Sequence, residues 1–363
     1  MHHSSLSRPI HGGNLTWAAQ LAGCSPACLL DFSANINPLG PPNSAIEAIH
    51  THLPALRDYP DPDYGALRQA LGQAHALSAD WIFPGNGAAE LLTWASRELA
   101  QLDCTYLIAP TFGDYRRALQ AFSASVTTCP LEFSLSHQDS PVVEQLPLPA
   151  SPRSSHCGVV LNSPHNPTGL LFSRKALIPY LEQFALVVVD EAFMDFLPPD
   201  EEQSLVAWVA THPNLVVLRS LTKFYSIPGL RLGYAVAHPD RLQRWQQWRD
   251  PWSVNSLAAA VGEVIVQDVE FQQQTWDWLA PARAQLLQPL AQISGLHPYP
   301  SSANFILVRS DESVIQLQER LLRHQQIFIR DCLSYPELGD RYFRIAVRTQ
   351  LDNQRLLEGL KAR

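Results

Sequence analysis

The chain has 363 residues, 46% of them hydrophobic and 17% charged, with a formal net charge of −8 at pH 7. This length is enough for a sizeable core and suggests two domains, or one large domain with a smaller partner. The acidic balance argues against general nucleic-acid binding, which needs a basic surface. Anionic small substrates remain compatible with it, because local arginines can oppose the global charge.

Neither the N-terminus nor the cysteines indicate export or a metal site. The first ten residues, MHHSSLSRPI, lack an apolar signal core. No apolar run approaches the length of about 18 residues that a membrane helix needs. Of the six cysteines only Cys24 and Cys28 lie close together, and no second pair or nearby histidine completes a zinc pattern. We therefore expect a soluble, cytoplasmic protein with reduced, partly buried thiols and no metal.

Short apolar runs alternate along the chain with helical patterns. The runs are four or five residues long and apolar throughout, as in strands that are buried on both faces. They lie at residues 106–109, 158–161, 185–189, 215–218 and 234–237. This pattern predicts an α/β fold with a mostly parallel central sheet between helices. The stretch 130–157, rich in Ser, Pro and Gln, predicts a surface connection with little regular structure.

The C-terminal third predicts a second, smaller α/β unit. A long helical stretch covers residues 254–293, and strand candidates follow at 305–308 and 342–347. We expect an N-terminal arm (1–42) that joins the small domain, a large domain (43–250) and a small C-terminal domain (251–363).

Polar segments follow four of the apolar runs directly. They are PTFGDY (110–115), NSPHNPTG (162–169), DEAF (190–193) and SLTK (220–223). In open α/β sheets ligands bind beyond the carboxyl ends of the strands. The four segments are therefore expected to bring functional groups to one edge of one sheet.

The groups in these segments suit pyridoxal 5'-phosphate (PLP). This cofactor needs an amine for covalent attachment, an anion at its pyridine nitrogen, a cradle for its phosphate and a partner for its ring hydroxyl. Lys223 supplies the amine, although a lone lysine among 26 basic residues is usually a solvated charge. Ser220, three residues before it, and Arg231, eight residues after it, are at offsets from which both can reach a phosphate.

Asp190 and a glycine-bearing turn complete the predicted cofactor site. Asp190 ends the apolar run LVVVD, where a carboxylate is rarely left unpaired, and a protonated pyridine nitrogen is one partner. The alternative is an N-cap for the next helix. The segment PGNGAAE (84–90) is a turn before a helical pattern, and the N–H groups of Gly87 and Ala88 would hold the phosphate at the helix N-terminus.

Taken together, these segments resemble fold type I PLP-dependent enzymes, which comprise the aspartate aminotransferase superfamily and its histidinol-phosphate aminotransferase branch. The resemblance covers nearly the whole chain. It implies Phe112 on the ring face, Asn166 and Asp190 on the ring, Ser220 and Arg231 on the phosphate, and Lys223 as the catalytic lysine. The histidinol-phosphate branch usually has a tyrosine where this chain has Phe193. The change removes one hydrogen bond to the ring hydroxyl and weakens a plain aminotransferase assignment.

Five segments are more closely similar to the L-threonine-O-3-phosphate decarboxylase family. They are HGGN (11–14), DFSANINPLG (31–40), DEAFMDF (190–196), LRSLTKFYSIPGLRLGY (218–234) and PWSVN (251–255). The first two are the most specific, because general aminotransferases lack them. The resemblance implies decarboxylation of L-threonine O-3-phosphate to (R)-1-amino-2-propanol O-2-phosphate, for cobalamin biosynthesis. One departure is His165, at a position where we expect asparagine.

The same resemblance implies the substrate contacts. It places Asn35, Arg330 and Arg344 at the two anionic ends of the substrate, Tyr59 in the site of a neighbouring subunit, and His11 and Gly12 in an arm that closes over the site. A homodimer with shared active sites follows. A substrate with a carboxylate and a phosphate needs more than one guanidinium, and bidentate contacts hold it in one orientation. For Arg344 the alternative is a surface position on an edge strand. Other arginines are expected to be peripheral, namely Arg341, Arg348 and Arg355, although Arg355 is a candidate for assisting a phosphate.

Two other functions remain open at this point. One is an aminotransferase acting on a phosphorylated or aromatic substrate such as histidinol phosphate. The other is a protein that binds PLP for regulation without turnover. A fused helix-turn-helix domain would favour that function, and no such domain is visible in the sequence. A dinucleotide-binding dehydrogenase is disfavoured, because no GxGxxG follows an early strand. PLP enzymes select their reaction by which Cα bond stands perpendicular to the ring, and that angle is not encoded in a motif.

Overall fold

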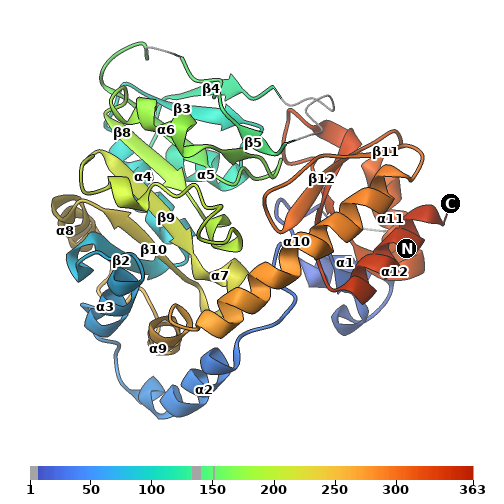
Figure 1. The fold of residues 1–363 in the computed structure, drawn as a ribbon, viewed down its shortest axis with the longest axis horizontal. Coiled ribbons are helices and arrows are strands. Elements are labelled where there is room, and N and C mark those ends of the chain that lie inside the picture. The colour runs from blue at the N-terminus through green and yellow to red at the C-terminus, as the bar shows by residue number, and fades with distance from the viewer. Residues whose placement is uncertain (1–6, 133–139, 150–151, 363) are drawn as a thin grey trace.

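The computed structural model describes residues 7–132, 140–149 and 152–362, and a seven-stranded sheet is its largest feature (Figure 1). The strands, in spatial order, are β2 (Ile82–Asn86), β10 (Leu232–Ala237), β9 (Leu215–Ser220), β8 (Leu186–Asp190), β6 (Cys157–Asn162), β3 (Cys104–Ala109) and β4 (Val126–Pro130). β10 runs antiparallel to both β2 and β9, and the remaining pairs are parallel.

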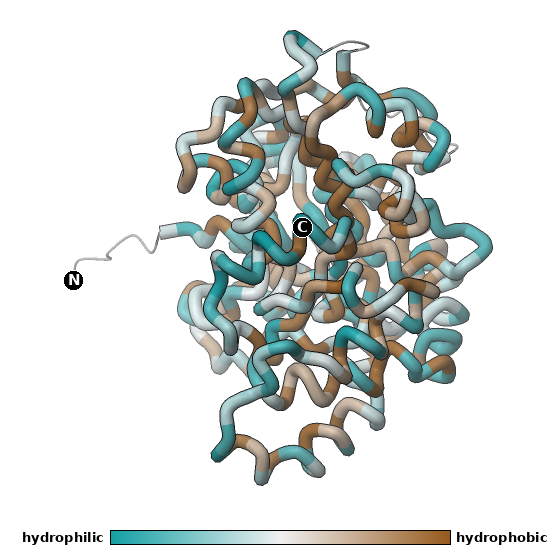
Figure 2. The backbone as a smooth tube through the Cα atoms, turned by 90° about the vertical axis from the view of Figure 1, so that its left-hand side faces the viewer, coloured by the Kyte–Doolittle hydropathy of each residue, from teal (hydrophilic) through white to brown (hydrophobic). Residues whose placement is uncertain are grey.

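The prediction of a mostly parallel α/β sheet is confirmed, with one strand reversed. Four of the five apolar runs lie within strands, and the run 185–189 begins one residue before β8. The run 234–237 belongs to β10, which runs antiparallel to its neighbours. The strands are apolar throughout because both faces of the sheet are covered. Along β6, Val159 and Leu161 pack into one hydrophobic cluster while Val160 packs into the other. Figure 2 shows the hydrophobic segments concentrated within the body of the molecule.

Helices cover the two faces of the large sheet. One face packs against α4 (Ala88–Leu99), α5 (Gly113–Gln120) and α8 (Pro239–Trp248). The other face packs against α3 (Gly65–Ala74), α6 (Arg174–Leu181) and α9 (Ser256–Ile265). α2 (Asn43–His52) packs on α9, and α10 (Val269–Ala291) belongs to the same hydrophobic cluster. The short helix α7 (Leu221–Phe224) follows β9 directly.

A second sheet, of four antiparallel strands, lies at the other end of the molecule. Its order is β11 (Leu296–Pro298), β12 (Phe305–Ser310), β15 (Tyr342–Ala346) and β14 (Arg330–Asp331). The long helix α10 runs from the large sheet toward this one, beside α11 (Val314–Gln325) and α12 (Gln350–Lys361) (Figure 1). The strand candidates 305–308 and 342–347 correspond to β12 and β15, the latter ending one residue early.

The N-terminal segment lies with the C-terminal elements. Strand β1 (Leu30–Asp31) pairs in parallel with β13 (Ile327–Phe328), and α1 (Leu15–Ala22) packs against α11 (Figure 1). The domain division at residue 250 stays a prediction, since α9, just beyond it, packs against α2 and α3. No helix in the described part of the chain is long and apolar enough to cross a membrane.

Two sequence predictions need correction. The helical stretch 254–293 is two helices, α9 and α10, because the Asp268 side chain accepts a hydrogen bond from Phe271 N and starts a new helix. The stretch 130–157 is more ordered than expected where it is described. Strand β5 (Val142–Val143) pairs with β7 (Leu171–Phe172), and Leu146 and Leu148 are buried. Residues 133–139 and 150–151 of that stretch lie outside the described residues.

Candidate active site

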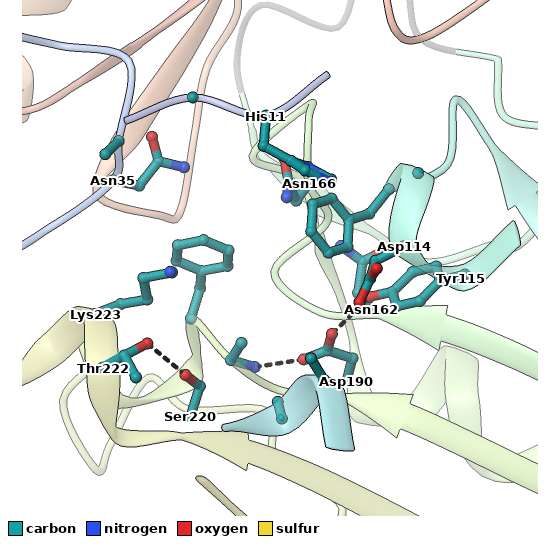
Figure 3. A pocket seen from close by; sticks show the side chains of 18 of the residues that line it. His11, Asn35, Asp114, Tyr115, Asn162, Asn166, Asp190, Ser220, Thr222 and Lys223 are labelled. Atoms are coloured by element: carbon teal, nitrogen blue, oxygen red, sulfur yellow. Dashed lines mark hydrogen bonds between the residues drawn. The ribbon is translucent and has the colours of Figure 1, made fainter. Parts of the chain in front are cut away.

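A cavity of about 350 Å³ lies at the carboxyl ends of the parallel strands (Figure 3). Each of the four polar segments contributes to its wall: Phe112 follows β3, Asn166 follows β6, Asp190 ends β8, and Ser220 ends β9 just before Lys223. The N-terminal arm and the small sheet close the cavity from the other side. Segments distant in sequence therefore meet at one edge of the large sheet, as the order of motifs predicts.

Lys223 enters the cavity from α7 and faces Asp190 across it (Figure 3). Its amine forms no hydrogen bond or ion pair with any other described residue. Burial, together with the positive charges of Arg231 and Arg344, lowers the pKa of Lys223 to about 8, while Asp190 acts in the opposite direction. A substantial neutral fraction near neutral pH makes this amine a competent nucleophile.

Asp190 is a partly buried carboxylate that accepts hydrogen bonds from two sides. Tyr115 donates its phenol proton to Asp190 Oδ2 at 2.7 Å, and the Ala192 N–H donates to Oδ1 at 3.0 Å. Burial raises the pKa of Asp190, and these hydrogen bonds and Lys223 oppose that rise. Asp190 is not the N-cap of the next helix, as the alternative interpretation proposed, because that helix (Met194–Phe196) has Phe193 as its N-cap. The Asp190 side chain lines the cavity instead.

The expected phosphate cradle lies at the N-terminus of α4. Gly87 has φ of 73°, and a Cβ there would stand 2.4 Å from Arg231 Nη2, so glycine lets the guanidinium approach the turn. The Gly87 N–H is not free, because it donates to the Gly85 carbonyl at 2.7 Å. The cavity wall here is formed by Ala88 and Ala89. Ser220 Oγ lies 2.8 Å from Thr222 Oγ1, which places two hydroxyls together beside this turn.

The residues present fit PLP. A partly buried amine with no partner among the described residues faces a partly buried carboxylate, and hydroxyls, a guanidinium and a helix N-terminus line one end of the cavity. Lys223 matches the aldehyde, Asp190 the ring nitrogen, and Ser220, Arg231 and Ala88 the phosphate. Phe112 also lines the wall, where the resemblance expects a ring stacked on the cofactor.

Two buried arginines oppose each other across the small sheet. Arg330 on β14 and Arg344 on β15 are directly paired in register, with only 4% and 7% of their surfaces exposed. Like charges placed directly opposite are destabilising. Arg344 forms no ion pair with a carboxylate among the described residues; it donates to Asn166 Oδ1 and, at 3.2 Å, to the Ser33 carbonyl. β15 lies between β12 and β14, so the alternative of a surface arginine on an edge strand is wrong.

The N-terminal arm contributes the remaining wall. His11, Gly12 and Asn35 all line the cavity. The His11 ring packs against Phe112 with centroids 5.9 Å apart, and a Cβ at Gly12 would stand 2.2 Å from the Ser33 carbonyl oxygen. The buried Asn35 Oδ1 has no hydrogen-bond partner among the described residues.

Arg330 joins the arm to the small sheet. Its guanidinium donates to the Ile10 carbonyl and, at 2.6 Å, to Ser334 Oγ. Burial lowers the pKa of His11, and the negative charge of Asp114 opposes that shift.

Tyr59 lies outside the cavity of its own chain. Its side chain is 81% exposed, and its ring packs on Trp252 with centroids 4.6 Å apart. Its expected role in a neighbouring site stays a prediction. The arginines expected to be peripheral do not line the cavity in the described part; they donate to backbone carbonyls, Arg341 to Asp311, Arg348 to Asp31 and Arg355 to Gln325.

The two departures from the related families have distinct surroundings. His165 is buried beside the cavity, with Nδ1 2.8 Å from Thr168 Oγ1. Burial lowers the pKa of His165 to about 3, so the ring is neutral. Phe193 does line the cavity, and it meets Phe305 edge to face with centroids 5.0 Å apart.

Several cavity residues were not singled out from the sequence. They are Asp114, Tyr115, Asn162, Thr222, Ser334 and Tyr335. The first four belong to motifs quoted in the sequence analysis, which already indicated their position at the sheet edge. The sequence did not indicate which of their side chains point into the cavity. Tyr335, whose hydroxyl donates to Asn166 Oδ1 at 3.3 Å, belongs to none of these motifs.

Comparison with known proteins places the chain among related enzymes. Residues 28–361 match the family model of class I and II aminotransferases. The chain is 41% identical over 362 residues to threonine-phosphate decarboxylase of Salmonella typhimurium, which covers 98% of this chain and 97% of that protein. It is 29% identical to the adenosylcobalamin biosynthesis bifunctional protein CobDQ of Leptospira interrogans, over 97% of this chain and 41% of that one. The histidinol-phosphate aminotransferase of Sinorhizobium meliloti, solved in complex with PLP, shares the fold with a TM-score of 0.80, 20% identity, and coverage of 99% and 98%.

Proposed function

Since the chain belongs to the family of class I and II aminotransferases, we propose that it is a PLP-dependent lyase that decarboxylates L-threonine O-3-phosphate. The product is (R)-1-amino-2-propanol O-2-phosphate, a step in cobalamin biosynthesis. The similarity to a threonine-phosphate decarboxylase over nearly the whole chain supports the reaction, and the similarity to a bifunctional adenosylcobalamin biosynthesis protein supports the pathway.

The opposed pair of Arg330 and Arg344 is the observation that carries this proposal. Two buried guanidinium groups face the same cavity as Lys223, and a third, Arg231, lies at its phosphate end. Arg231 is sufficient for the cofactor phosphate. The opposed pair then matches a substrate that brings two anionic groups, a carboxylate and a phosphate. Arg330 Nη1 already lies 3.7 Å from Asp331 Oδ1, so Arg344, which has no carboxylate partner among the described residues, is the buried charge that a second anionic end would compensate.

The cofactor contacts follow from the cavity wall. PLP, when bound, withdraws electrons from a bond at the substrate Cα. Lys223 would hold it covalently, Asp190 would pair with its ring nitrogen, and Phe112 would cover a ring face. Ser220, Thr222 and the α4 N-terminus would hold its phosphate together with Arg231. Asn166 has Oδ1 engaged by Arg344 and Tyr335, which leaves its Nδ2 to donate to the ring hydroxyl.

We propose that the same two arginines also determine which bond at the substrate Cα breaks. If Arg330 and Arg344 anchor the two anionic ends, the binding energy of the substrate phosphate orients the carboxylate out of the ring plane. Only in that orientation does the developing negative charge spread into the ring. With L-threonine, which lacks the phosphate, the enzyme should therefore have both a lower turnover rate and a lower affinity than with the phosphorylated substrate.

One experiment tests the reaction directly. The purified holoenzyme is incubated with L-threonine O-3-phosphate, and carbon dioxide release is measured against L-threonine and against a Lys223→Ala protein. We expect rapid release from the phosphorylated substrate, much slower release from L-threonine, and none with the Lys223→Ala protein. The competing function is a histidinol-phosphate-type aminotransferase, which the shared fold favours. Sustained amino transfer to 2-oxoglutarate without carbon dioxide release would overturn the proposal.

The proposal includes a homodimer. Exposed apolar side chains gather over α2, the 3-10 turn η2 (Leu53–Arg57), the segment after α8, and α9; they are Ile46, Leu53, Leu56, Tyr59, Trp252 and Val264. Packing of a second copy on this face would bury them and would bring Tyr59 to the neighbouring site. A cytoplasmic location is also proposed, supported by six cysteines that form no disulfide.

A further inference from the structure

Tyr115 connects two residues that are expected to contact the cofactor ring. Its phenol donates to Asp190 Oδ2 at 2.7 Å, and its ring meets Phe112 edge to face, with centroids 5.6 Å apart and an angle of 82°. The side chain is 2% exposed and lies on the first turn of α5. Burial raises the pKa of Tyr115 well above its usual value, so the phenol stays a donor at physiological pH.

The ionisation of Asp190 depends on this donor. Burial raises the pKa of Asp190, and three groups lower it: the Tyr115 phenol, the Ala192 N–H and the charge of Lys223. Asp114, a like charge, acts with burial. Among these groups the phenol donates directly to Oδ2. A hydrogen bond to the charged form of a carboxylate favours that form.

We propose that Tyr115 is a positioning residue that keeps Asp190 ionised and so keeps the shared proton on the ring nitrogen of PLP. The inference rests on the proposed placement of Asp190 at that nitrogen. A proton shared by a carboxylate and a pyridine resides on the more basic partner. When the phenol is removed, the carboxylate becomes the more basic partner, and the proton moves from the ring nitrogen to an oxygen of Asp190. The ring then withdraws electrons less strongly.

The packing of Tyr115 does not require its hydroxyl. The ring belongs to the hydrophobic cluster that covers one face of the large sheet, beside Ala118 and Leu119. Phenylalanine fills the same space, so Tyr115→Phe isolates the hydrogen bond. Hydrogen bonds to charged groups are strong enough that the balance should shift by about ten- to a hundredfold toward the protonated carboxyl.

The test observes the ring nitrogen itself. Cofactor-free wild type and Tyr115→Phe are reconstituted with PLP labelled with ¹⁵N in the ring, and the ¹⁵N signal is recorded from pH 6 to 9. We expect a protonated nitrogen in the wild type and a largely unprotonated one in the variant. In a second measurement an analogue with carbon in place of the ring nitrogen replaces PLP. The variant should be about tenfold slower than wild type with PLP and equal to it with the analogue.

Three further variants separate the possible failures. Asp190→Asn should also lose the protonated signal; if it does not, the proposed placement of Asp190 is wrong. If Asp190→Asn loses the signal and Tyr115→Phe keeps it, the role of Tyr115 is refuted. Tyr106→Phe removes a buried phenol on β3 that does not line the cavity, and it should leave the signal unchanged; an equal loss there refutes a specific role. Should Tyr115→Phe not fold, difluorotyrosine at position 115, a stronger donor, should increase the protonated fraction of the ring nitrogen at neutral pH, and an unchanged or smaller fraction contradicts the proposal.

Discussion

The amine of Lys223 offers the most direct test of the electrostatics of the cavity. In the cofactor-free protein burial lowers its pKa from 10.5 to about 8, with Arg231 and Arg344 adding to the effect. That lowering corresponds to roughly 3 kcal/mol in favour of the neutral amine. At pH 7.5 about a quarter of the Lys223 side chains are then neutral, against about one in a thousand for an unperturbed lysine. Because the neutral amine is the nucleophile, cofactor capture should accelerate accordingly.

Competitive labelling measures this pKa. The chain has three lysines, and the other two, Lys175 and Lys361, are exposed and serve as references within the same molecule. Cofactor-free protein is labelled with trace acetic anhydride from pH 6 to 11, and the extent of labelling of each lysine is determined by peptide mass. We expect Lys223 to have a midpoint near 8, and Arg231→Gln to move that midpoint upward.

A matched arginine provides the control. Arg320 pairs with Glu312 on the surface of the small sheet's helical layer and does not line the cavity. Arg320→Gln should leave the midpoint of Lys223 unchanged. A wild-type midpoint above 10, or equal shifts in the two arginine variants, would show that the cavity charges do not act on the lysine as described.

Three more predictions concern binding, assembly and acid stability. Arg330→Ala should lower kcat/KM for L-threonine O-3-phosphate, with a loss of transition-state stabilisation of at least about 2 kcal/mol, because an anionic group of the substrate loses its charged partner. A kcat/KM equal to that of the wild type would contradict this. Mixing Lys223→Ala with Tyr59→Phe should restore one of the two sites in a mixed dimer, as measured by carbon dioxide release, and a fully active monomer would refute shared sites. For His165 the folded pKa of about 3 lies below the unfolded value of 6.5, so the unfolded state binds more protons between these values and the free energy of unfolding falls as the pH drops from 6.5 to 3. Urea unfolding of His165→Asn should show a flatter pH dependence, and an unchanged slope would exclude this histidine as the cause.

Much of the fold could be predicted because buried parallel strands have a distinctive pattern. Runs such as 185–189 are apolar throughout, and each coincides with a strand to within one residue at its start. The direction of β10 could not be predicted from its residues, because an apolar strand has the same pattern in either orientation. The break before α10 was predictable in principle, since Asp268 is a typical N-cap residue. The pairing of β5 with β7 depends on contacts across nearly 30 residues and has no local signal.

The residues of the candidate site likewise fall into those that the sequence pattern predicts and those that depend on tertiary contacts. Lys223, Asp190 and Ser220 could be proposed from sequence because each lies at the end of a strand or within three residues of it. The edge of a parallel sheet brings such residues together. Arg330 and Arg344 came from family resemblance, since their pairing in register depends on how β14 and β15 align. The contact of Tyr115 with Asp190 was not predicted, because the direction of a phenol depends on packing around its ring. Likewise the engagement of the Gly87 N–H by Gly85 depends on the local turn geometry.

The parallel pairing of β1 with β13 has a consequence for how the protein is made. Leu30 is the register partner of Ile327 in this pairing. The N-terminal segment therefore has no strand partner until nearly the whole polypeptide has left the ribosome. At about 5–20 residues per second, the intervening stretch of roughly 300 residues takes on the order of 15 to 60 seconds to synthesise. During that interval the large sheet can form while the arm that carries His11 and Asn35 remains undocked. The nascent enzyme therefore acquires its cofactor-binding residues first and its substrate-enclosing wall last, so a truncated translation product would retain the lysine but lack a closed cavity around it.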